Sequence, residues 1–199
     1  MMLKASTCQI SYKSRATILF PQPYFYVTLS KNTQEHFMKS ARKIILCIVS
    51  IAIPLALGMI SSLIARGAMQ QFGAMNQPPL SPPAWLFPVA WTILYVCMGL
   101  ASFFLMNANV TDASSRTHRK ISIVLYAVQL VLNFVWSPIF FNARLYYVAL
   151  AVLFIMWLCI LAIMIFARKI HKASFWLLLP YILWTTFAAY LNIGIAMLN

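Results

Sequence analysis

Charged residues, and acidic ones above all, are scarce in this sequence. Of its 199 residues only 9% are charged, and 15 Lys and Arg stand against 2 Asp and Glu. A soluble domain carries roughly 25% charged residues to keep its surface hydrated. This chain has too few charged residues to cover the surface of such a domain. Hydrophobic residues make up 63% of the sequence. We therefore expect an integral membrane protein.

Clustered metal ligands and paired cysteines are also missing. The four cysteines are far apart, and none has the C-x-x-C spacing of a zinc or redox site. The three histidines lie outside the apolar runs, beside basic residues. We expect no disulfide framework, no metal site and no bound cofactor. We expect no nucleic-acid partner either, because the basic residues stand in short runs between apolar spans.

Five apolar runs without Asp, Glu, Lys, Arg or His are long enough to cross a bilayer. They cover residues 44–64, 84–106, 121–141, 146–166 and 176–198. A helix needs about 20 residues to cross the hydrocarbon core, and each run reaches that length. Membrane β-strands alternate apolar and polar residues, which these continuous runs do not. The sequence therefore predicts an all-α membrane protein, a five-transmembrane-helix bundle.

Basic residues flank these runs on alternating sides. Two of them, Arg66 and Arg144, lie on one side of the predicted membrane. Nine lie on the other side: Lys39, Arg42, Lys43, Arg116, Arg119, Lys120, Arg168, Lys169 and Lys172. By the positive-inside rule the N-terminus is inside and the C-terminus outside.

Residues 1–37 differ from the rest of the chain. They mix polar and aromatic residues, and they contain neither a spanning run nor the pattern of a signal peptide. Met38 directly precedes the basic flank of the first span. We expect either a flexible tail or an extension that is not translated, and the transmembrane domain then covers residues 38–199.

Uncharged polar and aromatic residues recur at helical spacing inside three of the runs. The series are Trp91, Tyr95, Met98 and Ser102; Tyr126, Gln129, Asn133 and Trp136; and Tyr181, Trp184, Ala188 and Leu191. Each steps by three or four residues and so lies on one helix face. An amide facing lipid would leave its donors unsatisfied, so these faces point into the bundle. They predict an internal ligand pocket; the alternative is that the amides only join helices by hydrogen bonds.

Asp, Glu, Lys, Arg and His do not occur inside the five runs. Proton pumps and ion-coupled carriers place charges at membrane depth, so these classes are disfavoured. The runs also contain no constellation of acid, base, nucleophile or metal ligands, so ordinary hydrolytic or acid-base catalysis lacks its parts.

Three motifs in these runs resemble the family of tryptophan-rich sensory proteins and translocator proteins, also called the TspO/MBR or peripheral benzodiazepine receptor family. They are PPAWLFP at 82–88 followed by WTILY at 91–95, LNFVWSPIFF at 132–141, and PYILW at 180–184 followed by LN at 191–192. The resemblance runs in order from about Lys39 to Ile195.

This resemblance implies tilted helices around a cavity open toward the first loop. The implied function is binding or sensing of tetrapyrroles, namely protoporphyrin IX and haem, and of related hydrophobic ligands. The resemblance implies that Trp91 and Trp184 occupy the positions of two pocket tryptophans that are tied to light-dependent porphyrin breakdown in the family. It also implies that five further residues line the pocket: Tyr95, Gln129, Asn133, Trp136 and Ala188. A porphyrin-degrading enzyme and a transporter of lipophilic molecules are the alternatives.

Partners and membrane follow from the same resemblance. We expect a homodimer in contact with membrane lipid, in a bacterial cell membrane rather than an organelle membrane. The pattern Gly58-x-x-x-Ser62 is too common in membrane helices to locate a dimer interface.

The first loop departs from the family's pattern. Trp-Tyr-x-x-Leu-x-Lys-Pro-x-Trp in the family is replaced here by QFGAMNQPPL at 71–80, which removes two indoles and a positive charge. A sterol-recognition pattern at the end of the last run is also missing, which disfavours cholesterol as the ligand.

Overall fold

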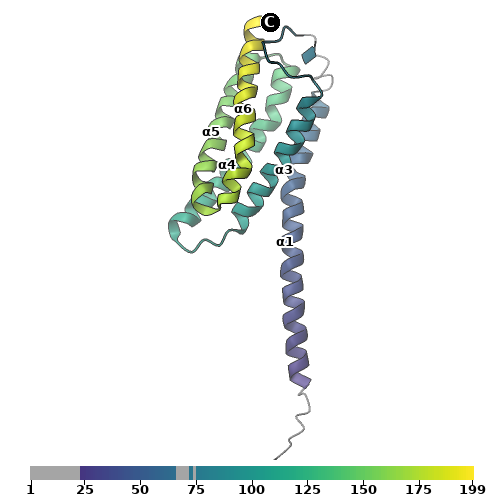
Figure 1. The fold of residues 1–199 in the computed structure, drawn as a ribbon, viewed down its shortest axis with the longest axis vertical. Coiled ribbons are helices and arrows are strands. Elements are labelled where there is room, and N and C mark those ends of the chain that lie inside the picture. The colour runs from purple at the N-terminus through teal and green to yellow at the C-terminus, as the bar shows by residue number, and fades with distance from the viewer. Residues whose placement is uncertain (1–22, 66–71, 74) are drawn as a thin grey trace, which may run out of the picture. The chain divides into compact units, whose positions relative to one another are not determined.

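The computed structural model describes residues 23–65, 72–73 and 75–199, and all the long elements among these residues are α-helices. The helices are α1 (Pro23–Ile64), α3 (Leu86–Asn107), α4 (Ala113–Phe141), α5 (Tyr146–Ile170) and α6 (Lys172–Leu198) (Figure 1). All five are long and apolar enough to cross a membrane. The predicted all-α class and the five predicted spans are confirmed. Residues 1–22 of the predicted tail lie outside the described residues.

Most of these helices are longer than the uncharged runs that predicted them. α1 begins at Pro23, inside the predicted tail, and α4 begins at Ala113 rather than at Ile121. α5 continues to Ile170. The additional turns carry the basic flanks, because Lys and Arg side chains can extend to water while their backbone remains helical. An uncharged run therefore locates a span but not the ends of its helix.

The chain forms two compact units, residues 1–42 and 43–199. In the first unit the side chains from Thr33 to Ser40 are exposed. Glu35 and Lys39 form an ion pair across one helical turn, with an N–O distance of 3.8 Å. An exposed pair of this kind contributes about 0.3–0.5 kcal/mol. The candidate site belongs to the second unit.

Helices α3 to α6 pack around an apolar core, with α4 against α5, α5 against α6, and α6 against α3 (Figure 1). Met98 on α3, Ile160 on α5 and Tyr181 on α6 have no exposed surface. A second apolar cluster contains Phe72, Phe140, Ala149 and Ile195. This second cluster lies at the end of the bundle where α6 ends.

Gly99 allows α1 and α3 to approach each other closely. A Cβ atom at Gly99 would lie 2.5 Å from the Cα of Ile51 and 2.7 Å from the carbonyl oxygen of Ser50. Both neighbours are backbone atoms, which cannot rotate away as a side chain can. Only glycine fits at this contact without moving the two helices apart.

Two side-chain hydrogen bonds join α1 to α4. The Ser61 hydroxyl donates to the carbonyl oxygen of Phe134 at 2.7 Å. The Asn142 amide, just after α4, donates to the carbonyl oxygen of Ile64 at 2.9 Å. This second bond satisfies one of the carbonyl groups left free at the end of α1.

Residues 75–80 are fastened to the end of α6. The backbone N–H of Asn76 donates to the side-chain oxygen of Asn199, and the Asn199 amide donates back to the Asn76 carbonyl, both at 3.0 Å. The ring of Pro78 rests on Gly194, where a Cβ atom would lie 2.5 Å from two of its carbons. These contacts hold residues 76–78 against the C-terminal end of α6.

Asp112 caps the other end of the bundle, at the start of α4. Its carboxylate accepts a hydrogen bond from the backbone N–H of Ser115 at 2.7 Å. This bond lowers the pKa of Asp112 below its ordinary value. The carboxylate therefore stays ionised at neutral pH and complements the positive end of the helix dipole.

Candidate ligand-binding site

A chain of hydrogen bonds between neutral side chains crosses the interior from α3 to α4 and α6. The Tyr95 hydroxyl donates to the Asn133 side-chain oxygen at 2.8 Å. The Asn133 amide donates to the Tyr181 hydroxyl at 3.3 Å, and that hydroxyl donates to the Gln129 oxygen at 2.7 Å. We call these four residues the polar chain. It brings three predicted lining residues together through a fourth residue, Tyr181.

Three of the four members of the polar chain are buried, and Tyr95 is half-buried. Tyr181 is 0% exposed and Gln129 is 1% exposed. The sulfur of Met156, on α5, lies 3.4 Å from the Tyr181 hydroxyl oxygen. Buried hydrogen bonds are strong in such surroundings because no water competes for their donors and acceptors.

Trp91 packs directly on the polar chain. Its ring centroid lies 5.5 Å from that of Tyr95 and 6.3 Å from that of Tyr181. The second contact is edge-to-face, an arrangement that aromatic pairs favour. Trp91 therefore places an indole against both tyrosine rings of the polar chain.

Gly58 of α1 makes room for the Tyr95 ring. A Cβ atom at Gly58 would overlap the Tyr95 ring atoms. The glycine of the Gly58-x-x-x-Ser62 pattern is thus used within the chain, to position a tyrosine of the polar chain.

The remaining predicted residues lie elsewhere in the interior. Trp184 makes an edge-to-face contact with Phe87, with centroids 6.1 Å apart. Trp136 stacks on Phe140 at 5.1 Å, and its indole N–H has no hydrogen-bond partner among the described residues. Ala188 is buried in the main core, one turn after Trp184.

Tyr181 and Met156 are missing from the predicted site. Tyr181 begins the inward-facing series on α6, and this periodicity identifies its face but not its partners. Met156 lies on α5, whose sequence contains no amide and gives no polar signal. Only the packing of the four helices reveals that Tyr181 belongs to the polar chain and that Met156 contacts it.

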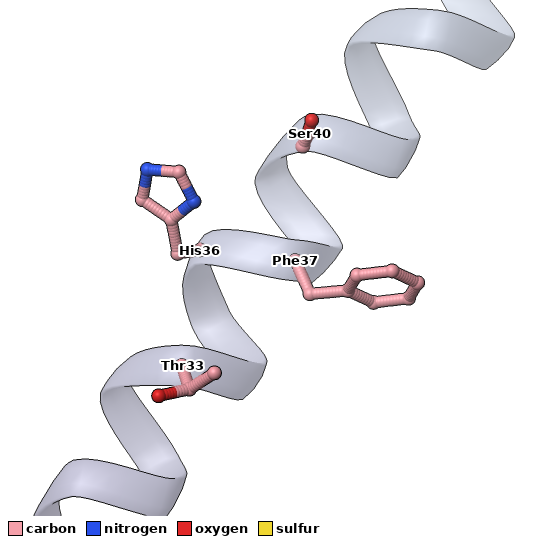
Figure 2. A pocket seen from close by; sticks show the side chains of 4 residues that line it. All are labelled: Thr33, His36, Phe37 and Ser40. Carbon is pink, nitrogen blue, oxygen red and sulfur yellow. The ribbon is translucent and has the colours of Figure 1, made fainter.

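The N-terminal half of α1 carries a hollow of a different kind. It is lined by Thr33, His36, Phe37 and Ser40, and Figure 2 shows all four projecting from one helix. Phe37 is 72% exposed. One exposed helix cannot enclose a small molecule as a binding site does. The interior around the polar chain is therefore the better candidate.

Metal chemistry has no ligand set in the part of the chain that the structure describes, since no three His, Cys, Asp or Glu residues gather there. The interior instead offers hydroxyl and amide groups beside aromatic rings. Such surroundings suit a flat, largely apolar molecule with a few polar atoms.

Comparison with known sequences identifies relatives across most of the chain. A sequence profile described as the TspO/MBR family matches residues 50–198. "Tryptophan-rich protein TspO" from Chlorobaculum tepidum is 31% identical over 159 residues, which cover 79% of this chain and 98% of the relative. "Tryptophan-rich sensory protein" from Cereibacter sphaeroides is 36% identical over 63% of this chain and 74% of the relative. "Translocator protein" from Ovis aries is 30% identical over 68% and 79% of the two chains.

Proposed function

This chain belongs to the TspO/MBR family, and on that premise we propose that it binds or senses tetrapyrroles such as protoporphyrin IX and haem. It is a multi-pass integral membrane protein. The observation that carries the proposal is the meeting of Trp91 with the polar chain inside the bundle.

The chemistry of a tetrapyrrole matches the residues at this position. Its macrocycle is flat and apolar, so it can stack on an indole such as Trp91. Its pyrrole nitrogens and carboxyl groups need hydrogen-bonding partners when they leave water. The carboxamides of Asn133 and Gln129 provide donors and acceptors, provided that the ligand exchanges its bonds for those of the polar chain.

Binding is tested by titrating purified protein in detergent with protoporphyrin IX and following ligand fluorescence. Trp91→Phe and Trp184→Phe keep much of the aromatic area, so each should weaken binding by less than about tenfold. Trp157→Phe is the matched control, because the Trp157 indole bonds to Thr186 on the outer side of α5 and α6. An equal effect of all three variants would contradict the assignment.

The same samples separate binding from degradation. Under illumination in aerated buffer, an electron that passes from an indole to the excited porphyrin would leave an indole radical cation and a porphyrin radical anion. Dissolved oxygen, as the oxidant, would then consume the macrocycle, and the porphyrin absorbance should fall. Phe is a poorer electron donor, so Trp91→Phe should reduce this loss much more than it reduces affinity. Unchanged absorbance in the wild-type protein would leave binding as the function and rule out the enzyme.

A further inference from the structure

We infer that Asn192, with the indole N–H of Trp136, forms a polar subsite that binds a neutral ligand group able to donate and accept hydrogen bonds. A carboxamide, a lactam or a protonated carboxylic acid is such a group. The inference deepens the proposed function, and it rests on that function for the view that the interior receives a flat ligand.

The Asn192 side chain is buried without a partner. Only 1% of the residue is exposed, and neither its side-chain oxygen nor its nitrogen has a hydrogen-bond partner among the described residues. Burying an amide without hydrogen bonds is costly, and native proteins seldom leave both of its ends unsatisfied. A buried amide in this state therefore indicates a group that completes it.

Asn192 and Trp136 lie at the junction of the two apolar clusters. Along α6, Asn192 stands between Ala188 of the main cluster and Ile195 of the second cluster. On α4, Trp136 packs against both clusters. Among the described residues at this end of the bundle, its indole N–H is the other buried donor without a partner.

The chemistry of the two groups specifies the ligand group. A carboxamide offers both donors and an acceptor, so it pairs best with a group that offers the same. An indole N–H adds one donor. An unpaired buried ion would be far more costly than a neutral group, and neither the Asn192 amide nor the Trp136 indole carries a charge that could pair with one. The subsite is therefore selective for neutral groups.

The separation between Trp91 and Asn192 would orient a ligand. Trp91 and the amides of the polar chain lie toward the middle of the bundle, whereas Asn192 lies about three helical turns farther along α6 than Tyr181. A molecule the size of a tetrapyrrole can reach from one to the other. Its ring would lie on Trp91 and one polar substituent would reach Asn192.

The test compares two flat probes that differ in one donor. Naphthalene-2-carboxamide donates and accepts, whereas methyl naphthalene-2-carboxylate only accepts. We expect the amide to raise the thermal midpoint of the purified wild-type protein at a concentration about tenfold lower than the ester, as for the gain of one or two hydrogen bonds. In Asn192→Leu, which keeps the side-chain size, the two probes should act alike.

Two further variants sharpen the result. Ser122→Ala is the control, because the Ser122 hydroxyl is equally buried and unpartnered but lies near the opposite end of α4. It should retain the wild-type preference for the amide. Trp136→Phe removes a donor that either carbonyl could use, so it should weaken both probes equally.

Several outcomes would overturn the inference. These are equal action of the two probes on the wild type, an unchanged preference in Asn192→Leu, or failure of Asn192→Leu to fold, which would show that the amide has a structural partner. Titration of the same samples with protoporphyrin IX separates the two proposals. Loss of tetrapyrrole binding with a preserved amide preference removes only the proposed function, and the reverse removes only the subsite.

Discussion

At the scale of single residues, the interior depends on Tyr181. Its hydroxyl is the only link between the amides of Asn133 and Gln129 within the polar chain, as one donates to it and the other accepts from it. The residue is wholly buried, so water cannot replace a lost bond. A small change here should therefore have a large effect.

Tyr181→Phe removes the hydroxyl and leaves two buried amide groups short of a partner. We expect a loss of about 1–3 kcal/mol, seen as a fall of about 2–10 °C in the thermal midpoint in detergent. Tyr190→Phe is the control, because the Tyr190 hydroxyl bonds to Pro79 at the surface. Adding Gln129→Leu to Tyr181→Phe should recover part of the loss. A midpoint unchanged by Tyr181→Phe would mean that the hydroxyl contributes nothing.

The sequence identifies the inward faces at this scale but not the pairs across them. Periodicity places Gln129 and Asn133 on one face, and Tyr95 and Tyr181 on two others. Which side chains meet depends on how far each helix is shifted along its neighbour. That shift is decided by contacts such as Gly99 against α1, whose significance appears only when both helices are seen.

At the scale of helices, glycines control how closely α1 packs. Gly99→Ala would place a methyl group against the backbone of Ile51 and Ser50, so the helices must separate. We expect a destabilisation of about 1–3 kcal/mol, as for overpacking in a core. The measurement is the thermal midpoint.

Gly73→Ala is the matched control, since no atom of a non-adjacent residue in the described part of the chain would lie within 4 Å of the new Cβ. It should change the midpoint little. If both substitutions have the same effect, the contact between α1 and α3 is not close in solution.

The helices themselves are well predicted because an uncharged run of membrane length has few alternatives. Three predicted ends, at Ile64, Phe141 and Leu198, coincide with observed ends. The starts are less well predicted, as at Pro23 and Ala113. A charge can stand on a continuing helix, so its position does not show where the helix begins.

At the scale of the whole molecule, the uneven distribution of basic residues predicts an orientation. The end of the bundle with the start of α6 carries most of the Lys and Arg residues, so it should lie inside the cell. Lys172→Cys and Leu80→Cys place exposed thiols at opposite ends, Leu80 being 85% exposed. Both variants also carry Cys8→Ser, which removes the one native cysteine outside the predicted spans. In intact cells, an impermeant thiol reagent should label the Leu80→Cys protein and leave the Lys172→Cys protein unlabelled. The reverse labelling pattern would contradict the predicted orientation.

The polar chain also bears on proton transfer inside the bundle. Hydrogen-bonded hydroxyl groups arranged in a row can pass protons from one oxygen to the next. Here the row from Tyr95 to Tyr181 passes through the carboxamide of Asn133, which receives on its oxygen and donates from its nitrogen. A carboxamide neither gains nor loses a proton at physiological pH. Asn133 therefore interrupts proton transfer between the hydroxyls of Tyr95 and Tyr181, although hydrogen bonds join all three side chains.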